Sequence, residues 1–210
     1  SWDARVAALR AHDMGIVLDI VPNHMGVGAE NPFWDDLFAN GPASRYASWF
    51  DIDWNAPARG LEGRVLIPIL GRELEDAIAH HELSLVFEHG RYRIHYFDQS
   101  FPLDPATLPR VLELAMASLA PNAASDGAAE LSAIARSLTE LPPRLTSRRA
   151  LIERRQAEAP ELLRRLDALV ARAPDVLAAL EGSAREFANG DGGAARLIAL
   201  LDAQVYALVF

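Results

Sequence analysis

Three polar residues follow one another closely at the end of an apolar stretch near the amino terminus. Asp19 interrupts the branched apolar residues of Ile16–Val21, and Asn23 and His24 come directly after them. A carboxylate, an amide and an imidazole grouped in this way can hydrogen-bond a bound ligand or assist proton transfer. On spacing alone, a structural aspartate followed by a solvent-exposed loop histidine explains the same residues, and that alternative stays open.

The elements expected to position these residues are a helix and a buried strand. Apolar residues recur at helical spacing in residues 1–12, and Gly15 lies just past the expected helix end. The branched residues that follow are typical of a parallel strand buried on both faces. Buried there, Asp19 needs an arginine or another donor from a neighbouring strand. In parallel α/β folds, ligands bind just beyond the carboxyl ends of such strands.

A loop-rich, aromatic segment is expected from Met25 to Asn55. Acidic side chains beside aromatic rings are common in sugar sites. The candidates for lining such a site are Trp34, Trp49, Asp51 and Trp54. Two alternatives stay open, because many of these rings can be plain core and acids such as Asp53 can cap turns.

Short strands are expected in the middle of the chain. Val65–Leu70 is a strand candidate that Pro68 restricts to a sheet edge. Alternating apolar residues flank a turn near His89-Gly90, which predicts a β-hairpin. The residues of its buried face are Leu85, Phe87, Tyr92, Ile94 and Tyr96. We expect Arg93, which alternates with them, to point to solvent.

The chain after Pro105 is expected to be helical and to serve packing rather than chemistry. One apolar stripe ends where Pro142-Pro143 stops its helix. The stripe consists of Leu131, Ile134, Leu138 and Leu141. Further helices are expected near Arg148–Ala157, Pro160–Ala171 and Pro174–Phe187. Asp191 is expected to cap a final helix that runs through Val209.

Composition excludes several classes of site. Of the 210 residues, 50% are hydrophobic and 23% are charged, which is typical of a globular chain. The chain holds neither cysteine nor lysine, so thiolate metal sites, cysteine nucleophiles, Schiff-base lysines and a P-loop lysine are excluded within it. The net charge of −9 argues against nucleic acid and anionic membranes as partners. His80 and His81 diverge on a helix, so no metal site is expected. The expected location is the cytoplasm.

The hexapeptide DIVPNH, residues 19–24, resembles the first conserved region of the α-amylase family of glycoside hydrolases and transferases. The resemblance implies a (β/α)8-barrel parent that acts on α-glucans, with this motif ending the third barrel strand. It implies that His24 hydrogen-bonds the glucosyl ring undergoing chemistry and that Asn23 braces the loop. It also implies that Asp19 orders the surrounding groups. No cofactor and no metal are expected.

Later stretches resemble the maltooligosyltrehalose synthases of that family. They are ENPFWDDLFANGPASRYASWFDIDW (30–54), RVLIPILG (64–71), RYRIHYFDQSFPL (91–103) and the closing ARLIALLDAQVYALVF (195–210). Such enzymes convert the reducing-end α-1,4 bond of a maltooligosaccharide into the α,α-1,1 bond of trehalose. This retaining transfer needs a carboxylate nucleophile and an acid/base carboxyl group. The family takes both from later barrel strands, so this chain is expected to hold no catalytic residue and to be inactive alone.

The resemblance divides the chain into four parts. Residues 1–24 are a barrel helix and strand, 25–105 a loop-rich inserted subdomain with the hairpin, 106–190 a helical insert and 191–210 the returning barrel helix. The chain is therefore expected to be a mostly helical α+β piece of an α/β barrel, with one barrel strand. Its expected partners are a maltooligosaccharide and the remaining barrel.

Two other functions stay open. Another α-glucan hydrolase or transferase of the same family fits DIVPNH equally well but does not account for the later stretches. A non-catalytic sugar-binding or interaction module could keep such a strand without any chemistry. Barrel strands carrying an aspartate, a glutamate and a second aspartate in the parent coding sequence would favour the enzyme.

Overall fold

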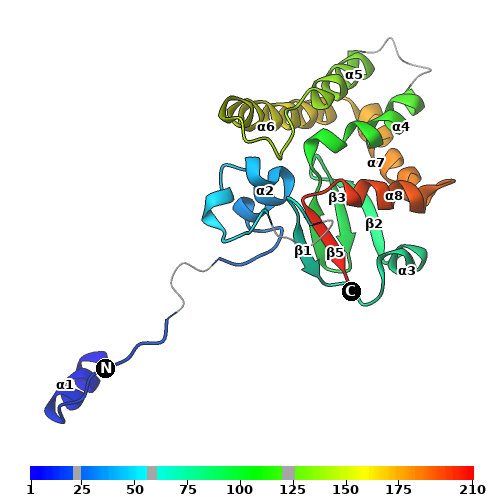
Figure 1. Cartoon of the computed structure of the whole chain (residues 1–210). Coiled ribbons are helices and arrows are strands. Elements are labelled where there is room, and N and C mark those ends of the chain that lie inside the picture. The colour runs from blue at the N-terminus through cyan, green and yellow to red at the C-terminus, as the bar shows by residue number, and fades with distance from the viewer. Residues whose placement is uncertain (21–24, 56–60, 120–125) are drawn as a thin grey trace.

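The chain forms a mixed structure of helices and two small sheets (Figure 1), and the computed structural model describes residues 1–20, 25–55, 61–119 and 126–210. The α-helices are α1 (Trp2–Ala11), α2 (Pro32–Asn40), α3 (Leu74–Ala79), α4 (Pro109–Leu119), α5 (Asp126–Thr139), α6 (Arg149–Arg172), α7 (Pro174–Asn189) and α8 (Gly193–Asp202). The strands are β1 (Val65–Pro68), β2 (Leu83–Glu88), β3 (Arg91–Tyr96), β4 (Gln99–Pro102) and β5 (Tyr206–Val209). Short 3-10 helices lie at Gly41–Ala43, Ala47–Trp49 and Pro105–Thr107. The described residues form no barrel.

The three-stranded antiparallel sheet confirms the predicted hairpin and adds a strand to it. Leu85 of β2 pairs with Ile94 of β3. His89 and Gly90 both have positive φ, as a two-residue type I′ turn requires. β4 pairs with the other edge of β3. This third strand was not predicted, because its four residues are too few to show a clear alternation.

Helices cover the buried face of this sheet. α7 packs on β2, and α4 packs on α7. Tyr92 of β3 shares a hydrogen bond of 2.7 Å with the Ser183 hydroxyl of α7, and burial raises the pKa of the Tyr92 phenol well above its usual value. The predicted apolar stripe is confirmed: Leu131, Ile134 and Leu138 of α5 are buried, and so is Leu141, just after the helix ends.

The carboxyl-terminal segment differs from its prediction. α8 ends at Asp202, and Tyr206–Val209 form β5, which pairs in parallel with β1. A short apolar run can form either a helix or a strand, and here the pairing with β1 decides. The predicted cap is also wrong, because α8 begins after Gly192 in the left-handed conformation, with no side-chain cap. The prediction that Pro68 confines its strand to an edge is confirmed, since β1 pairs with β5 alone among the described strands.

α6 is one helix where two were expected. Pro160 lies inside it and removes one backbone hydrogen bond, which costs about 3 kcal/mol in a helix interior. The apolar residues on both sides of this proline share one buried stripe: Ala159, Leu162, Leu166 and Leu169. Burial of that stripe on α5 and α7 outweighs the lost hydrogen bond. None of the described helices combines the length and apolar character that crossing a membrane requires.

The amino-terminal helix forms as predicted, but the strand predicted after it does not. α1 buries none of its residues, and Figure 1 shows it apart from the rest of the structure. Residues 16–20 form no strand, and Val17 is 97% exposed. Branched residues favour a strand only where a neighbouring strand pairs with them and packs beside them. Among the described residues, no strand does so for this segment.

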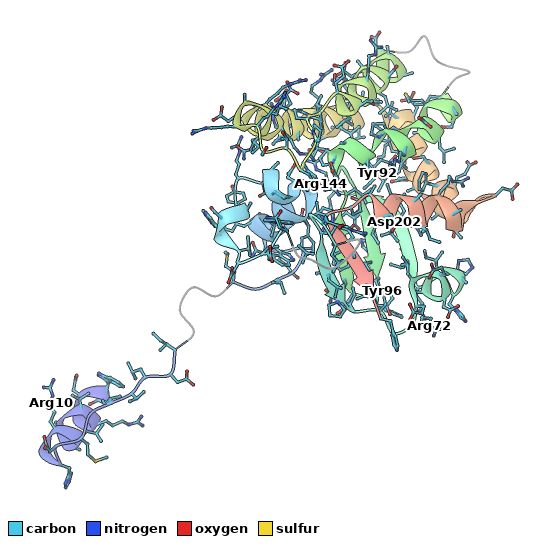
Figure 2. All side chains as sticks on the ribbon, viewed as in Figure 1. Arg10, Arg72, Tyr92, Tyr96, Arg144 and Asp202 are labelled. Carbon is cyan, nitrogen blue, oxygen red and sulfur yellow. The ribbon has the colours of Figure 1, made fainter. Side chains whose placement is uncertain are left out.

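A buried polar network joins the helices to the segment that follows β4. The Asp104 carboxylate accepts hydrogen bonds from Arg155 Nη2 at 2.6 Å and from Arg144 Nη1 at 3.0 Å. Asp104 is 2% exposed and Arg155 is fully buried. The side-chain oxygen of Gln204, also fully buried, accepts from the Asp104 N–H at 2.8 Å. In Figure 2, Arg144 lies where the helices meet the sheets, so the network sits at the junction of the fold.

Arg155 also forms hydrogen bonds with two further segments of the chain. Its Nη1 donates to the Pro142 carbonyl at 2.8 Å and its Nε donates to Asn40 Oδ1 at 3.1 Å. A buried guanidinium is tolerated only when its donors are satisfied in this way. Arg155 therefore joins α2 and the turn after α5 to α6.

The hairpin register predicts a large effect for one substitution. Ile94→Asp should lower the free energy of unfolding by more than about 3 kcal/mol, because it buries a carboxylate without a partner. Ser84→Asp is the control, since Ser84 lies exposed on the neighbouring strand, and it should change that free energy by less than about 0.5 kcal/mol. Urea denaturation followed by circular dichroism measures both. Equal midpoints for the two variants would contradict the register.

The buried network predicts a contrast between adjacent arginines of α6. Arg155→Ala should lower the free energy of unfolding by about 3–5 kcal/mol, because it leaves Asp104 as a buried charge that has lost a partner. Arg154→Ala should change that free energy by less than about 0.5 kcal/mol, since Arg154 is exposed and makes only a surface ion pair with Glu158 and a long hydrogen bond to the Glu140 carbonyl. The same denaturation experiment compares them. Similar losses in both variants would show that the network does not hold the fold.

Candidate functional site

A hollow with a volume of about 120 Å³ lies between α2, β1 and β4. Ligand sites commonly measure about 300–1,000 Å³ and combine an apolar lining with a few polar groups. The apolar lining consists of Val27, Trp34, Phe38, Ile67, Ile69, Phe101 and Pro102. The polar side chains are those of Asp35, Gln99 and Ser100. The hollow therefore has the mixed lining of a small-molecule site but a smaller volume.

α2 supplies one wall of the hollow, and its amino-terminal cap fixes where it begins. The Asn31 side chain accepts a hydrogen bond from the Trp34 N–H at 3.2 Å and donates one to the Gly26 carbonyl at 2.7 Å. Pro32 occupies the first turn, where its missing N–H costs nothing. Trp34 and Phe38, one turn apart, both line the hollow. This helix was not predicted, although the Asn-Pro pair was an available signal for its start.

Arg93 fastens α2 to the sheet at the polar side of the hollow. Its guanidinium forms a two-point ion pair with Asp35, with N–O distances of 2.7 and 3.1 Å. Its Nε also donates to Ser100 Oγ at 2.6 Å. The Arg93 side chain is only 11% exposed. The prediction that Arg93 points freely to solvent is therefore wrong, because α2 covers this part of the outer face of the sheet.

A histidine and a glutamate continue this polar row across the sheet. His95 Nε2 lies 2.7 Å from Glu88 Oε1 and 3.3 Å from Ser100 Oγ. A serine nucleophile needs the serine on one imidazole nitrogen and the orienting acid on the other, whereas both groups here contact Nε2. The row therefore does not activate Ser100 for attack. The described residues also hold no group of three histidine or acidic side chains that could bind a metal ion.

The aromatic rings beside the hollow support one another. The ring centroid of Trp34 lies 4.4 Å from that of Phe38 and 5.1 Å from that of Phe50. Phe38 in turn packs against Tyr206 of β5 at 5.5 Å. These contacts fix the Trp34 ring in a half-buried position, with part of it open to the hollow.

The four residues that the sequence predicted to line a sugar site do not lie together in the structure. Trp34 lines the hollow, but Trp49, Asp51 and Trp54 are not among the residues that line it. Trp49 is 52% exposed and packs on Phe33, with ring centroids 4.9 Å apart. Asp51 is exposed and Trp54 is half-buried. The residues that sequence reasoning missed at the hollow come from the loop before α2, from α2, from β1 and the residue after it, and from β4.

The motif residues near the amino terminus are not joined to this hollow. Asp19 is exposed, so its predicted burial in a strand is wrong for this chain. Asn23 and His24 lie outside the described residues. Their roles at a sugar ring therefore stay predictions.

Parts of the chain are similar to two kinds of curated protein. A Mycobacterium tuberculosis protein named "Putative maltooligosyl trehalose synthase" is 42% identical over 73 residues, which are 34% of this chain and 9% of that protein. "Intracellular maltogenic amylase" of Bacillus subtilis is 45% identical over 47 residues, which are 22% of this chain and 8% of that protein. The similarities point to a relative in the amylase family. The matched stretches span less than a tenth of either relative's length.

Two further comparisons give no match. No family model matches the chain, and no solved structure matches it. The relationship therefore rests on the two partial similarities in sequence.

The ion pair beside the hollow predicts a measurable coupling. In a double-mutant cycle of Arg93→Ala and Asp35→Ala, the free energies of unfolding should show a coupling of about 1–2 kcal/mol, because both side chains are partly buried and the pair is bidentate. The control cycle uses Arg149→Ala and Glu153→Ala, an exposed pair on α6 that should show no resolvable coupling. A vanishing coupling for the first pair would mean that Arg93 does not fasten α2 to the sheet.

Proposed function

We propose that this chain is part of an amylase-family enzyme that acts on maltooligosaccharides. More specifically, we assign it to a glucosylmutase that converts the reducing-end α-1,4 bond into the α,α-1,1 bond of trehalose. The observation that carries this proposal is the 42% identity over 73 residues to a protein named as a maltooligosyl trehalose synthase. The resemblance of DIVPNH, residues 19–24, to the first conserved region of the family supports it.

In this proposal the amino-terminal motif contacts the reacting sugar. A retaining transfer passes through an oxocarbenium-like transition state, so groups that hold the glucosyl ring matter more there than in the ground state. His24 donates a hydrogen bond to a hydroxyl of that ring, and Asn23 braces the loop. Asp19 orients the arginine and carboxylates around the ring. The nucleophile and the acid/base carboxyl group come from other parts of the complete polypeptide.

The exposed segment after α1 is compatible with this assignment. Four of residues 16–20 are branched and apolar, yet none of the five is buried. A strand of that composition is stable when neighbouring strands pair with both of its edges and other elements cover both of its faces. We therefore assign residues 1–24 to the barrel of the complete enzyme, and residues 25–105, which supply the lining of the hollow, to an inserted subdomain. Residues 106–190 form its helical insert.

A maltogenic hydrolase is the second candidate function. It is favoured by the 45% identity over 47 residues to the Bacillus subtilis amylase. DIVPNH accommodates either enzyme, because the motif concerns the ring that both reactions attack. The products distinguish them, since hydrolysis creates new reducing ends whereas the mutase reaction removes them.

The proposal predicts the behaviour of one motif variant. In the complete enzyme that contains this chain, His24→Ala should lower kcat/KM on maltopentaose by about 10²-fold, or about 3 kcal/mol of transition-state stabilisation. The control is Glu161→Ala, at an exposed position of α6. Its kcat/KM should stay within about twofold of that of the unaltered enzyme. Chromatography of the non-reducing product measures both.

Three results would contradict the proposal. Unaltered turnover in the His24→Ala variant would remove His24 from the site. Release of shorter reducing sugars in place of a trehalose-terminated product would favour the hydrolase. Trehalose-terminated product from the 210-residue chain alone would contradict the assignment of the catalytic carboxylates to other parts of the polypeptide.

A further inference from the structure

One backbone carbonyl of α6 lacks its usual helical partner. In an α-helix each carbonyl accepts a hydrogen bond from the N–H four residues later, so the Gln156 carbonyl would accept from residue 160. Residue 160 is a proline, which has no N–H and whose ring crowds the carbonyl four positions earlier. Such a carbonyl needs another donor. Arg45 supplies it, because its Nη2 donates to the Gln156 carbonyl at 2.7 Å.

The same turn of α6 holds the neighbouring residues as well. The Gln156 side chain donates from Nε2 to the Ala43 carbonyl at 3.0 Å. Ala43 is fully buried, where a carbonyl requires a hydrogen-bond donor. Between these two contacts, Ser44 Oγ donates to Asp36 Oδ2 of α2 at 2.5 Å. Residues 43–45 are therefore fastened to α6 on one side and to α2 on the other.

Residues 41–50, which we call the strap, carry aromatic rings that pack on α2. The ring centroid of Trp49 lies 4.9 Å from that of Phe33. Phe50 packs against Trp34 at 5.1 Å, and Trp34 lines the hollow. The strap therefore connects α6 to the aromatic wall of the hollow.

The strap has little secondary structure of its own. It contains the two short 3-10 helices Gly41–Ala43 and Ala47–Trp49, and Trp49 is 52% exposed. Segments with few backbone hydrogen bonds and exposed side chains open locally at a small free-energy cost. The contacts with α6 therefore decide how readily the strap opens.

We propose that Pro160 and Arg45 form a latch through which the helical insert sets the position of the strap and of the aromatic wall behind it. The missing N–H of Pro160 leaves the Gln156 carbonyl free, and Arg45 occupies it. Weakening the latch lets residues 44–50 open while the sheets and helices stay folded. The helical insert then has a positioning role in addition to packing, and this role does not depend on the proposed function.

The test is native-state amide hydrogen exchange of the 210-residue chain, followed by NMR. The Trp49 N–H donates to the Tyr46 carbonyl at 2.9 Å, so its exchange reports opening of the strap. Arg45→Ala should raise the Trp49 exchange rate about 5- to 10-fold, the effect of losing one hydrogen bond. Arg185→Ala is the matched control, since it removes an exposed arginine of α7, and it should change that rate by less than about twofold.

Pro160→Ala should move local and global stability in opposite directions. An alanine at this position donates its N–H to the Gln156 carbonyl, so the Arg45 contact weakens and Trp49 exchanges about fivefold faster. The restored helical bond should raise the midpoint of thermal unfolding by about 2–4 °C. The control Pro174→Ala should leave Trp49 exchange unchanged, because Pro174 lies in the first turn of α7, where a missing N–H costs nothing.

The double variant Arg45→Ala, Pro160→Ala decides the proposal. Once the Gln156 carbonyl has its helical partner, loss of Arg45 should add little, so Trp49 should exchange within about twofold of the rate in Arg45→Ala alone. Arg45 and Pro160 are both exposed, so the variants leave the core intact, and thermal melts check that each one folds. Multiplying rate increases in the double variant, or unchanged Trp49 exchange in Arg45→Ala, would overturn the latch.

Discussion

The fold depends on one buried carboxylate. Asp104 lies between Arg155 and Arg144, and its own N–H donates to Gln204, so one residue joins segments that are 40 to 100 positions away in the chain. Burial of these charges is tolerable only because they pair, and each partner left alone would carry the full cost of desolvation. One donor of the network is left unsatisfied, since Arg144 Nε has no hydrogen-bond partner in the described part of the chain. Such a network fixes one arrangement of helices more strictly than apolar contacts do.

The site follows from this junction. Arg155 also bonds Asn40 at the carboxyl end of α2, and Arg93 bonds Asp35 in the first turn, so the helix that carries Trp34 is held near both ends. Fixing the helix at these two points sets the position of its aromatic face against β4. A hollow lined by helices and strands fixed in this way keeps its shape more exactly than one lined by free loops.

The residue pattern within a short segment predicted the elements that depend only on neighbouring residues. The hairpin and the α5 stripe follow from alternation, spacing and turn residues that lie close together in the sequence. Arg93 was misjudged because alternation along β3 does not reveal which distant helix covers its outer face. Tyr206–Val209 was misjudged because its strand exists only through pairing with β1, about 140 residues earlier. Trp34 was a candidate and Val65–Leu70 an expected strand, but the hollow itself could not be predicted, since its lining comes together from separated stretches of the chain.

The exposed segment after α1 affects the tendency of the chain to aggregate. Ile16, Val17, Leu18 and Ile20 form a short window of high β-propensity without proline, which is the composition that pairs with copies of itself in cross-β aggregates. Asp19 is the single charge inside that window. Stacking identical strands in register would place these carboxylates next to one another, where they repel. Asp19 therefore acts as a gatekeeper against self-association, whatever else it does.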